Sequence, residues 1–384
     1  MLFNACNCVS GSSLLSAYGP LCAGGAGFVS AMVASMVASA QTARAQTLGR
    51  AIPEVDRLAV RIVTDNMVIQ FVPAEKRDGL TIERRTTGNL IPDAWPRASL
   101  NAEWGLSMHA ESQRGGEVRN VLIDFGYTPE VLLNNMAILK VDPAILDALV
   151  LSHGHYDHFG GMVGFLAANK SKLKSKMPFF VGGEDCFCLR KTPAGNFGAL
   201  DRKAIFEANL ELMMAEGPAI VAGHGFTTGR IGQRSFETPL RATSEIVGIF
   251  DGFGCYPEKM PPAKNTGGYI PDDFEHEIAT NYVVKDRGLV VLTSCSHRGV
   301  INTVKQAQEV SGIDKVHAVI GGFHVVPPLG DDYIRQTIEA FKEIDPDHLI
   351  PAHCSGDRFY DLARQAMPDK VIHSAVGTRF IFGA

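Results

Sequence analysis

Leu149-Val150-Leu151-Ser152-His153-Gly154-His155-Tyr156-Asp157-His158 is the stretch of sequence that decides the fold of this chain. The apolar run 148–151 predicts a short buried strand, which leads directly into three histidines and one aspartate. Side chains in an extended segment point the same way at every second residue, so His153 and His155 can hold one cation between them. A buried strand that leads into such a run predicts a metal site at its end.

Asp157 and His158 extend this site, because the chain is expected to turn there and present a carboxylate and a third imidazole to a second cation. Imidazole together with carboxylate suits zinc, iron, manganese or nickel. We therefore expect one or two divalent transition-metal ions, with zinc first and the other three metals as alternatives. Gly160-Gly161 lets the helix that follows approach the site closely.

Further ligands must come from elsewhere in the chain, since one run cannot complete a metal site. The candidates lie in loops, in most cases directly after a predicted strand. They are Cys295 and His297 after strand 289–293, His324 after strand 316–320, His353 after strand 348–351, and His224 between two glycines. Isolated histidines without such a context are interpreted as structural: His109, His276, His317, His348 and His373.

The chain as a whole predicts an α/β protein. Strands are predicted over 58–63, 67–72, 121–124, 148–151, 177–181, 281–284, 289–293, 316–320 and 348–351. Helices are predicted over 132–139, 202–216, 300–310 and 333–344. The C-terminal half alternates strand and helix, with a chemically rich loop after each strand. This order is typical of α/β layers that carry their function at strand ends.

Composition narrows the classes of function. The 384 residues suffice for a sizeable core, and a formal net charge of −5 gives no basic footprint for nucleic acid. The eight cysteines are too sparse for a disulfide framework. The C-x-C pairs Cys6-Asn7-Cys8 and Cys186-Phe187-Cys188 have no matching second pair at zinc-knuckle spacing, so we interpret them as structural or incidental.

The first segment of the chain carries no charge before Arg44 and is apolar and rich in small residues. Ala43-Arg44-Ala45 has the small-x-small form of a signal-peptidase site. We therefore predict an export leader over residues 1–45, cleaved near Ala45, and a single domain over residues 46–384. The missing positive n-region keeps a cytoplasmic location as the alternative. Glycine, serine and Pro20 dilute the apolar run, so no stable membrane span is expected.

The motif H-x-H-x-D-H after a buried strand resembles the signature of the metallo-β-lactamase superfamily. More narrowly, the chain resembles the subgroup of 7,8-dihydropterin-6-methyl-4-(β-D-ribofuranosyl)-aminobenzene-5′-phosphate synthase-like proteins. The segments that carry the narrower likeness follow one another between residues 57 and 356. They are 65–66, 103–107, 122–126, 228–231, 236–237, 271–274 with Glu277, 295–302, Gly321-Gly322-Phe323-His324 and His353-Cys354-Ser355-Gly356.

This resemblance implies a four-layer αββα sandwich with one or two metal ions at the edge between its sheets. The ligands that it implies are His153 and His155 for the first ion, Asp157 and His158 for the second, and His353 in the last ligand position. His297 is expected as a further ligand with Cys295 as its rival, since a thiolate is also a good zinc ligand. His224 is a less certain candidate for the superfamily's middle histidine. Asp124 resembles an acid that orients a ligand histidine.

The expected activity is metal-dependent hydrolysis, in which activated water attacks an ester, lactone, phosphoester or similar group of a small-molecule substrate. Asp157 is expected to accept a proton, and His324 to polarise the substrate or move protons. The alternative is a transferase that condenses a pterin diphosphate with an aminobenzene ribosyl phosphate, as the name of the subgroup implies. Against it, the sequence shows no P-loop and no arginine cluster near the site. A di-iron oxidoreductase would need a flavin or another redox partner, and an inactive binding protein would not need the complete motif.

Overall fold

Short apolar strands form two large sheets in the computed structural model, which describes residues 51–85, 98–241 and 243–383. The predicted export leader lies outside these residues. Within them, the larger sheet has nine strands in the order β11 (Glu211–Met214), β8 (Pro178–Val181), β7 (Ala148–Val150), β6 (Glu117–Ile123), β5 (Ser107–Arg114), β2 (Arg57–Thr64), β22 (Arg379–Phe382), β4 (Leu80–Glu83) and β3 (Glu75–Arg77).

The second sheet has seven strands in the described part of the chain. Its order is β12 (Ile220–Val221), β13 (Gly225–Thr227), β18 (Thr280–Val284), β19 (Gly288–Leu292), β20 (Val316–Gly321) and β21 (His348–Pro351), and β1 (Glu54–Val55) pairs with β18. β18 and β19 form the antiparallel hairpin that the sequence predicts, whereas β19, β20 and β21 run parallel.

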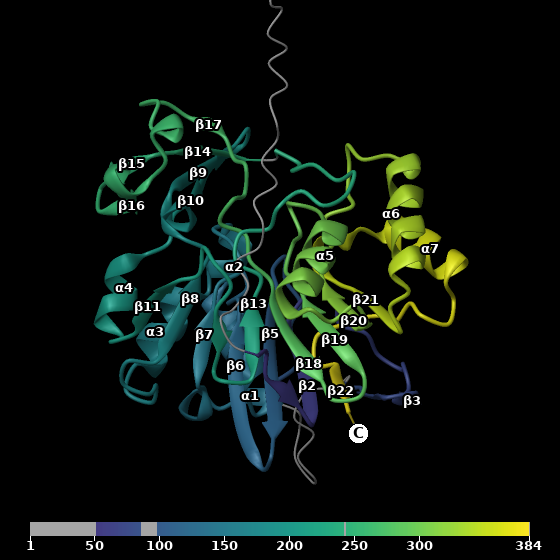
Figure 1. Ribbon diagram of the computed structural model, residues 1–384. Helices are drawn as coiled ribbons and strands as arrows, with labels where there is room; N and C mark the ends of the chain where they lie inside the picture. Colours follow the sequence, from purple (N-terminus) through teal and green to yellow (C-terminus); the bar gives the residue numbers. More distant parts are fainter. Residues whose placement is uncertain (1–50, 86–97, 242, 384) are drawn as a thin grey trace, which may run out of the picture. The chain divides into compact units, whose positions relative to one another are not determined.

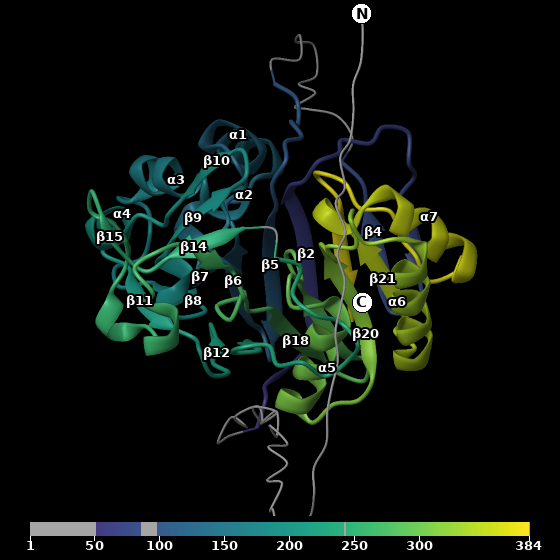
Figure 2. The same ribbon diagram turned by 90° about the horizontal axis from the view of Figure 1, so that it is seen from above.

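Helices cover the outer face of each sheet (Figures 1 and 2). α1 (Pro129–Leu139), α2 (Tyr156–Phe159), α3 (Met162–Asn169) and α4 (Arg202–Glu207) lie on the side of the larger sheet. α5 (Val300–Ser311), α6 (Asp331–Ile344) and α7 (Asp357–Ala366) lie on the side of the second sheet. Short 3₁₀ helices occur at Pro143–Ile145, Glu184–Phe187, Pro257–Lys259, Pro262–Lys264 and His353–Ser355. In the described ranges, no helix has the length and apolar character that crossing a bilayer requires.

Side chains of the central strands alternate between separate cores. In β7, Leu149 packs with residues of α1 and α3, whereas Val150 packs between the two sheets. In β19, Val291 packs with residues of α5 and α6, whereas Val290 packs between the sheets. A strand covered on both faces needs apolar residues at every position, which explains the continuous apolar run 148–151. The three cores separate four layers and confirm the predicted αββα sandwich.

A smaller substructure projects from the larger sheet. It consists of a four-stranded sheet, in the order β10 (Gly195–Gly198), β9 (Leu189–Thr192), β14 (Ser244–Ile246) and β17 (Ile270–Pro271), and of the hairpin β15 (Gly248–Phe250) and β16 (Phe253–Cys255). A disulfide between Cys188 and Cys255 joins the start of β9 to the end of β16. Cys188 of the Cys186-Phe187-Cys188 pair is therefore structural, and the fold brings it together with a cysteine 67 residues away.

Two predicted elements differ in the structure. The predicted strand 67–72 is irregular: Phe71 has a φ of 63° and is 95% exposed, and residues 67–72 pair with no strand in the described part of the chain. The predicted helix 202–216 ends at Glu207. Asn209 follows with a φ of 52°, and the remaining residues form β11, in which Leu212 pairs with Phe179 of β8. Pairing at the sheet edge overrides helix propensity there.

Helix α5 begins at a glycine, and a buried acid supplies its cap. Gly299 precedes α5 with a φ of 96° and offers no side chain. Glu237, which is 1% exposed, accepts a hydrogen bond at Oε2 from the backbone N–H of Asn302 at 3.0 Å. A Cβ on Gly299 would collide with this carboxylate, so only glycine fits. The cap fixes the start of α5 close behind Cys295 and His297.

Burial of Glu237 generates a prediction about pH and stability. Burial raises the pKa of this carboxyl from 4.5 to about 7, although backbone hydrogen bonds at the start of α5 lower it. The folded chain therefore binds this proton more tightly, and the resulting stability is complete below the unfolded pKa and lost as the pH rises through 7. Glu237→Gln should raise the free energy of unfolding at about pH 8 by about 1–3 kcal/mol relative to the wild type, and by less at about pH 5. Urea unfolding measures both values, and an equal change at the two pH values would contradict this account.

Candidate metal centre

The predicted ligands come together because they follow parallel strands. β6 and β7 are parallel neighbours in the larger sheet, and β19, β20 and β21 are parallel neighbours in the second sheet. Carboxyl ends of parallel strands lie at the same edge, so the loops after all five strands meet between the sheets. The run His153 to His158 follows β7, and the loops with Cys295, His324 and His353 follow β19, β20 and β21.

The first group of donors consists of His153, Cys295 and His297. One side-chain donor atom of each lies within 4.8 Å of those of the others. The ring of His155 adjoins this group, with its centroid 4.8 Å from that of His153 and 4.6 Å from that of His297. All four side chains are buried. The structure thus brings the predicted ligands of the first ion together.

The second group consists of Asp157, His158, Cys295 and His353, whose donor atoms also lie within 4.8 Å of one another. Asp157 Oδ2 is 3.2 Å from His353 Nε2 and 3.5 Å from His158 Nε2. His158 Nε2 is 3.1 Å from Cys295 Sγ. Cys295 belongs to both groups and therefore occupies a bridging position, while His297 belongs to the first. The geometry offers both side chains and leaves the choice of ligand between them a prediction.

Unpaired polar atoms test whether these residues suit a metal ion. Among the described residues, several buried donor atoms of the two groups have no hydrogen-bond partner: His153 Nε2, both ring nitrogens of His297, and Asp157 Oδ1. An unpaired buried polar atom costs about 1–3 kcal/mol, and buried polar atoms are rarely left so. A divalent ion would satisfy several of them at once. The donor set therefore fits the divalent metal that the fold implies.

Asp124 orients two of the histidines. Its Oδ2 accepts a hydrogen bond from His158 Nδ1 at 2.8 Å and another from the Ser152 hydroxyl at 2.8 Å. The Ser152 hydroxyl in turn accepts from His153 Nδ1 at 2.9 Å. Each imidazole thus has its Nδ1 occupied and presents Nε2 to the donor groups. This is the orienting role that the sequence predicts for Asp124.

His155 is held the other way round by a buried network. Its Nε2 donates to the Thr243 hydroxyl at 3.1 Å, and that hydroxyl donates to Asp272 Oδ2 at 3.2 Å. Arg190, which is fully buried, donates from Nε to the same carboxylate oxygen at 2.6 Å and pairs with Glu245 at 3.2 Å. Burial lowers the pKa of His155 to about 3, so the ring is neutral. Its remaining nitrogen, Nδ1, is the one available to an ion.

The charges around the second group favour a cation. Burial raises the pKa of Asp157, but His158 and His353 bring it well below its usual value, so the carboxylate stays ionised. Burial lowers the pKa of His158, but Asp157 and Asp124 raise it to about 10. The pKa of His153 lies well below its usual value because of burial and neighbouring imidazoles. An ion at the second group would take the place of the proton on His158.

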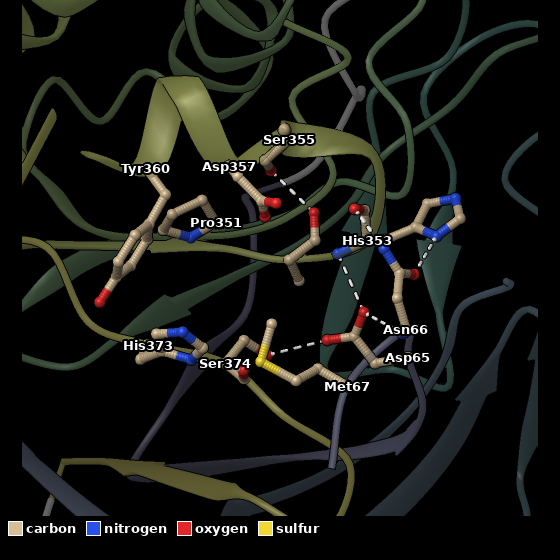
Figure 3. Close-up of a pocket in the computed structure, with 12 residues that line it drawn as sticks. Asp65, Asn66, Met67, Pro351, His353, Ser355, Asp357, Tyr360, His373 and Ser374 are labelled. Carbon is tan, nitrogen blue, oxygen red and sulfur yellow. Dashed lines mark hydrogen bonds between the residues drawn. The ribbon is translucent and has the colours of Figure 1, made fainter. Parts of the chain in front are cut away.

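Asp65 and Asn66 hold His353 from behind (Figure 3). Asp65 Oδ1 accepts from the backbone N–H of His353 at 2.9 Å, and Asn66 donates from Nδ2 to the His353 carbonyl at 2.7 Å. Asn66 Oδ1 lies 3.1 Å from His353 Nδ1, which leaves Nε2 to face Asp157. His353 has a φ of 47°, a strained conformation that these contacts sustain. The sequence signal for this pair was two polar residues at the end of a predicted strand.

Glu277 positions the loop that follows β19. Its two carboxylate oxygens accept from the backbone N–H groups of His297 and Arg298, each at 2.8 Å. Burial raises the pKa of Glu277 to about 7, although these two hydrogen bonds lower it. The ring of His297 stacks on Phe274 with centroids 4.0 Å apart and planes 6° apart. His297 is thus fixed by contacts to both its backbone and its ring.

Two further predicted residues have different positions. The ring of His324 lies 4.1 Å from that of His297, and its side chain forms a donor group with Cys295 and with Cys354, which the sequence did not assign to the site. His224 lies elsewhere: its Nδ1 is 3.0 Å from the Ser112 hydroxyl and its Nε2 is 3.5 Å from Glu117. The prediction of His224 as a metal ligand finds no support in its contacts, because a short turn carries it toward β5 rather than to the strand ends.

One family model and two known proteins resemble this chain in sequence. The model of the metallo-β-lactamase superfamily matches residues 114–173. The 7,8-dihydropterin-6-methyl-4-(β-D-ribofuranosyl)-aminobenzene-5′-phosphate synthase of Methanocaldococcus jannaschii is 28% identical over 267 residues, which cover 66% of this chain and 82% of that protein. The hydroxyacylglutathione hydrolase of Psychromonas ingrahamii is 28% identical over 145 residues, or 33% of this chain and 51% of that protein.

A crystal structure described as a metal-dependent hydrolase of the β-lactamase superfamily has the same fold. It superimposes with a TM-score of 0.60 at 20% sequence identity, over 84% of this chain and 98% of the other. The fold and the paired donor groups define an enzyme that depends on divalent metal ions. The chain carries a metallo-β-lactamase superfamily domain, and the family model matches it over residues 114–173. This confirms the resemblance that the H-x-H-x-D-H motif indicated.

The donor groups predict which variants lose metal. His153→Ala and Asp157→Ala should each weaken zinc binding by more than the roughly 10- to 100-fold that loss of an outer contact costs. His224→Ala is the matched control, since it removes a buried imidazole remote from both groups, and it should bind as the wild type does. Metal content after dialysis and competition with a chromogenic chelator measure the effect. Equal losses in all three variants would contradict the proposed ligand sets.

The contacts of Asn66 predict a smaller effect of the same kind. Asn66→Ala removes the partner of His353 Nδ1 and should raise the Kd for the more weakly bound ion about 10- to 100-fold. His373 lines the same pocket as Asn66 and His353, but its Nδ1 lies 2.9 Å from the carbonyl oxygen of Ser374. His373→Ala therefore leaves the Asn66–His353 contacts in place and serves as the control. Chelator competition reports both values. Unchanged affinity in Asn66→Ala would show that the ring needs no such support.

Proposed function

We propose that this protein is a metal-dependent hydrolase of a small-molecule ester, lactone, phosphoester or related compound. The observation that carries the proposal is the convergence of two buried donor groups on Cys295 at the edge between the sheets. A thiol among imidazoles and a carboxylate favours zinc, with iron, manganese and nickel as alternatives. The hydrolase names of the solved structure and of the relative from Psychromonas ingrahamii support a hydrolytic reaction.

Zinc ions, when bound, supply Lewis acidity that lowers the pKa of water and polarises the substrate. The ligands proposed to hold them are His153, His155, Asp157, His158, His297 and His353, with Cys295 between the groups. Asp157 Oδ1 has no hydrogen-bond partner among the described residues, whereas Oδ2 is 3.2 Å from His353. This free oxygen can accept the proton of the attacking water.

His324 is the residue that we propose for the leaving group. It lies next to His297 but is only partly buried, and its Nδ1 has no hydrogen-bond partner among the described residues. An imidazole at the solvent side of the donor groups can donate a proton to a departing alkoxide or hold the substrate's polar group. Asp157 and His324 would then act on opposite ends of the bond that breaks.

A condensing transferase is the second candidate function. The relative from Methanocaldococcus jannaschii is named as a synthase and covers two thirds of this chain. A hollow beside the site adds a physical reason: it is lined by Lys191 and Arg241, and also by Thr243, which contacts His155. The two positively charged side chains at this hollow favour a substrate with an anionic group, which a phosphate ester or a diphosphate would supply. The sequence showed no such pair, because the two residues lie 50 positions apart.

A substrate screen separates the two candidates. The zinc-loaded protein should hydrolyse at least one member of a panel of aryl esters, lactones, phosphodiesters and phosphomonoesters. Removal of metal with a chelator should abolish turnover, and Asp157→Asn at saturating zinc should lower kcat about 10²- to 10⁴-fold, because it removes the proton acceptor and weakens a metal ligand. His224→Ala should retain turnover. Turnover only of a pterin diphosphate with an arylamine would establish the transferase, and no turnover of either class would refute the proposal.

A further inference from the structure

Two thiols lie side by side at the metal centre. Cys354 Sγ is 3.3 Å from Cys295 Sγ and 3.6 Å from the Cys295 carbonyl oxygen. Both residues are 2% exposed and neither is in a disulfide. Cys186 is the remaining free cysteine of the described residues, and it is fully buried. The function proposed above uses Cys295 as a metal ligand and leaves Cys354 without a role.

The fold builds this contact from two strands that are not neighbours. Cys295 follows β19 and Cys354 follows β21, and β20 lies between these strands. Gly322, at the end of β20, opens the space, since a Cβ there would lie 2.6 Å from Cys354 Sγ. Glycine at this position thus allows the two loops to touch across the middle strand. The sheet therefore places the two thiols next to each other.

We propose that Cys295 and Cys354 form an oxidative modification site, in which closure to a disulfide takes Cys295 away from both metal-donor groups. A sulfur–sulfur bond needs about 2.05 Å, so the sulfurs must approach by roughly 1.3 Å from their 3.3 Å separation. Cys295 Sγ would then turn from His158 Nε2, now 3.1 Å away, toward Cys354. The proposal rests on the metal centre and not on the reaction that it catalyses.

The chemistry requires a peroxide and balances with it. The Cys354 thiol attacks the O–O bond, which breaks to give a sulfenic acid on Cys354 and one molecule of alcohol or water. The second thiol attacks the sulfenic sulfur, the disulfide forms, and water leaves with the remaining thiol proton. Two thiols lose two electrons, which reduce the peroxide. A metal ion bound to the Cys295 sulfur protects it, so the metal-free protein is the reactive form.

Peptide mapping under non-reducing conditions tests the site directly. Trypsin places Cys295 in peptide 288–298 and Cys354 in peptide 343–358. Metal-free protein treated with hydrogen peroxide should yield these two peptides as one linked product, and zinc-loaded protein should yield much less. The linked peptides 177–190 and 242–259, which carry the Cys188–Cys255 disulfide, are the internal reference.

Zinc affinity gives the readout for the consequence. After peroxide treatment the apparent Kd for zinc should rise about tenfold or more, and dithiothreitol should restore it. Cys354→Ser keeps Cys295 but cannot close the bond, so its zinc affinity should resist peroxide. Cys186→Ser, a buried thiol outside the pair, should respond as the wild type does.

Three outcomes would overturn the proposal. They are the absence of the linked product, a linked product that leaves zinc affinity unchanged, and a Cys354→Ser variant that loses zinc affinity as the wild type does. None of these readouts uses substrate turnover. A failed substrate screen would therefore refute the proposed hydrolase and leave the thiol pair to be judged by its own result.

Discussion

The hydrogen bond between Asp124 and His158 is the contact on which the metal centre depends. Asp124 directly follows β6 and has a φ of 59°, and its carboxylate also accepts from the backbone N–H of Ser152 at 2.8 Å. One buried acid thus joins the end of β6 to the loop after β7 and to α2. The same contact directs His158 Nε2 across to Cys295 of the second sheet. Without it, a fully buried imidazole would have no fixed orientation.

Three of the candidate ligand imidazoles have one ring nitrogen held by a neighbouring side chain, which leaves the other nitrogen for an ion. Ser152 holds His153, Thr243 holds His155, and Asn66 holds His353. These hydrogen bonds cost little conformational entropy in the folded chain, because the sheets and loops already fix the side chains that make them. The contacts of Asn66 also sustain the strained backbone at His353, whose φ is 47°. The protein arranges its donors before an ion arrives, which lowers the cost of binding.

The fold and the donor groups restrict the reaction to metal-dependent chemistry, but they do not identify the substrate. An ion beside Asp157 can bind a water molecule for hydrolysis or a phosphate group for transfer. The superfamily fold is compatible with both reactions. The side chains that would discriminate lie outside the donor groups. Lys191 and Arg241 line one hollow together with Thr243, and His324 is itself partly exposed. Lys191 lies on β9 of the small substructure closed by the Cys188–Cys255 disulfide, so this cationic side chain and the donor groups lie in different parts of the fold.

The sequence by itself predicted the α/β layers and the metal-binding run, because both depend on local patterns. The resemblance that this run carries implied the four-layer sandwich. Apolar strands of the predicted length lead into polar runs, and His153 to His158 needs no distant partner to be recognised. The sequence did not determine which side chains meet across the sheets: His224 was a less certain ligand candidate but lies beside Ser112, and Cys354 was given no contact but touches Cys295. Likewise β22 pairs with β2 over 300 residues away, and Thr243 reaches His155 from a loop without any signal. Only the tertiary structure decided these contacts, because the energy of a long-range contact depends on which strands become neighbours and not on the residues beside it in the chain.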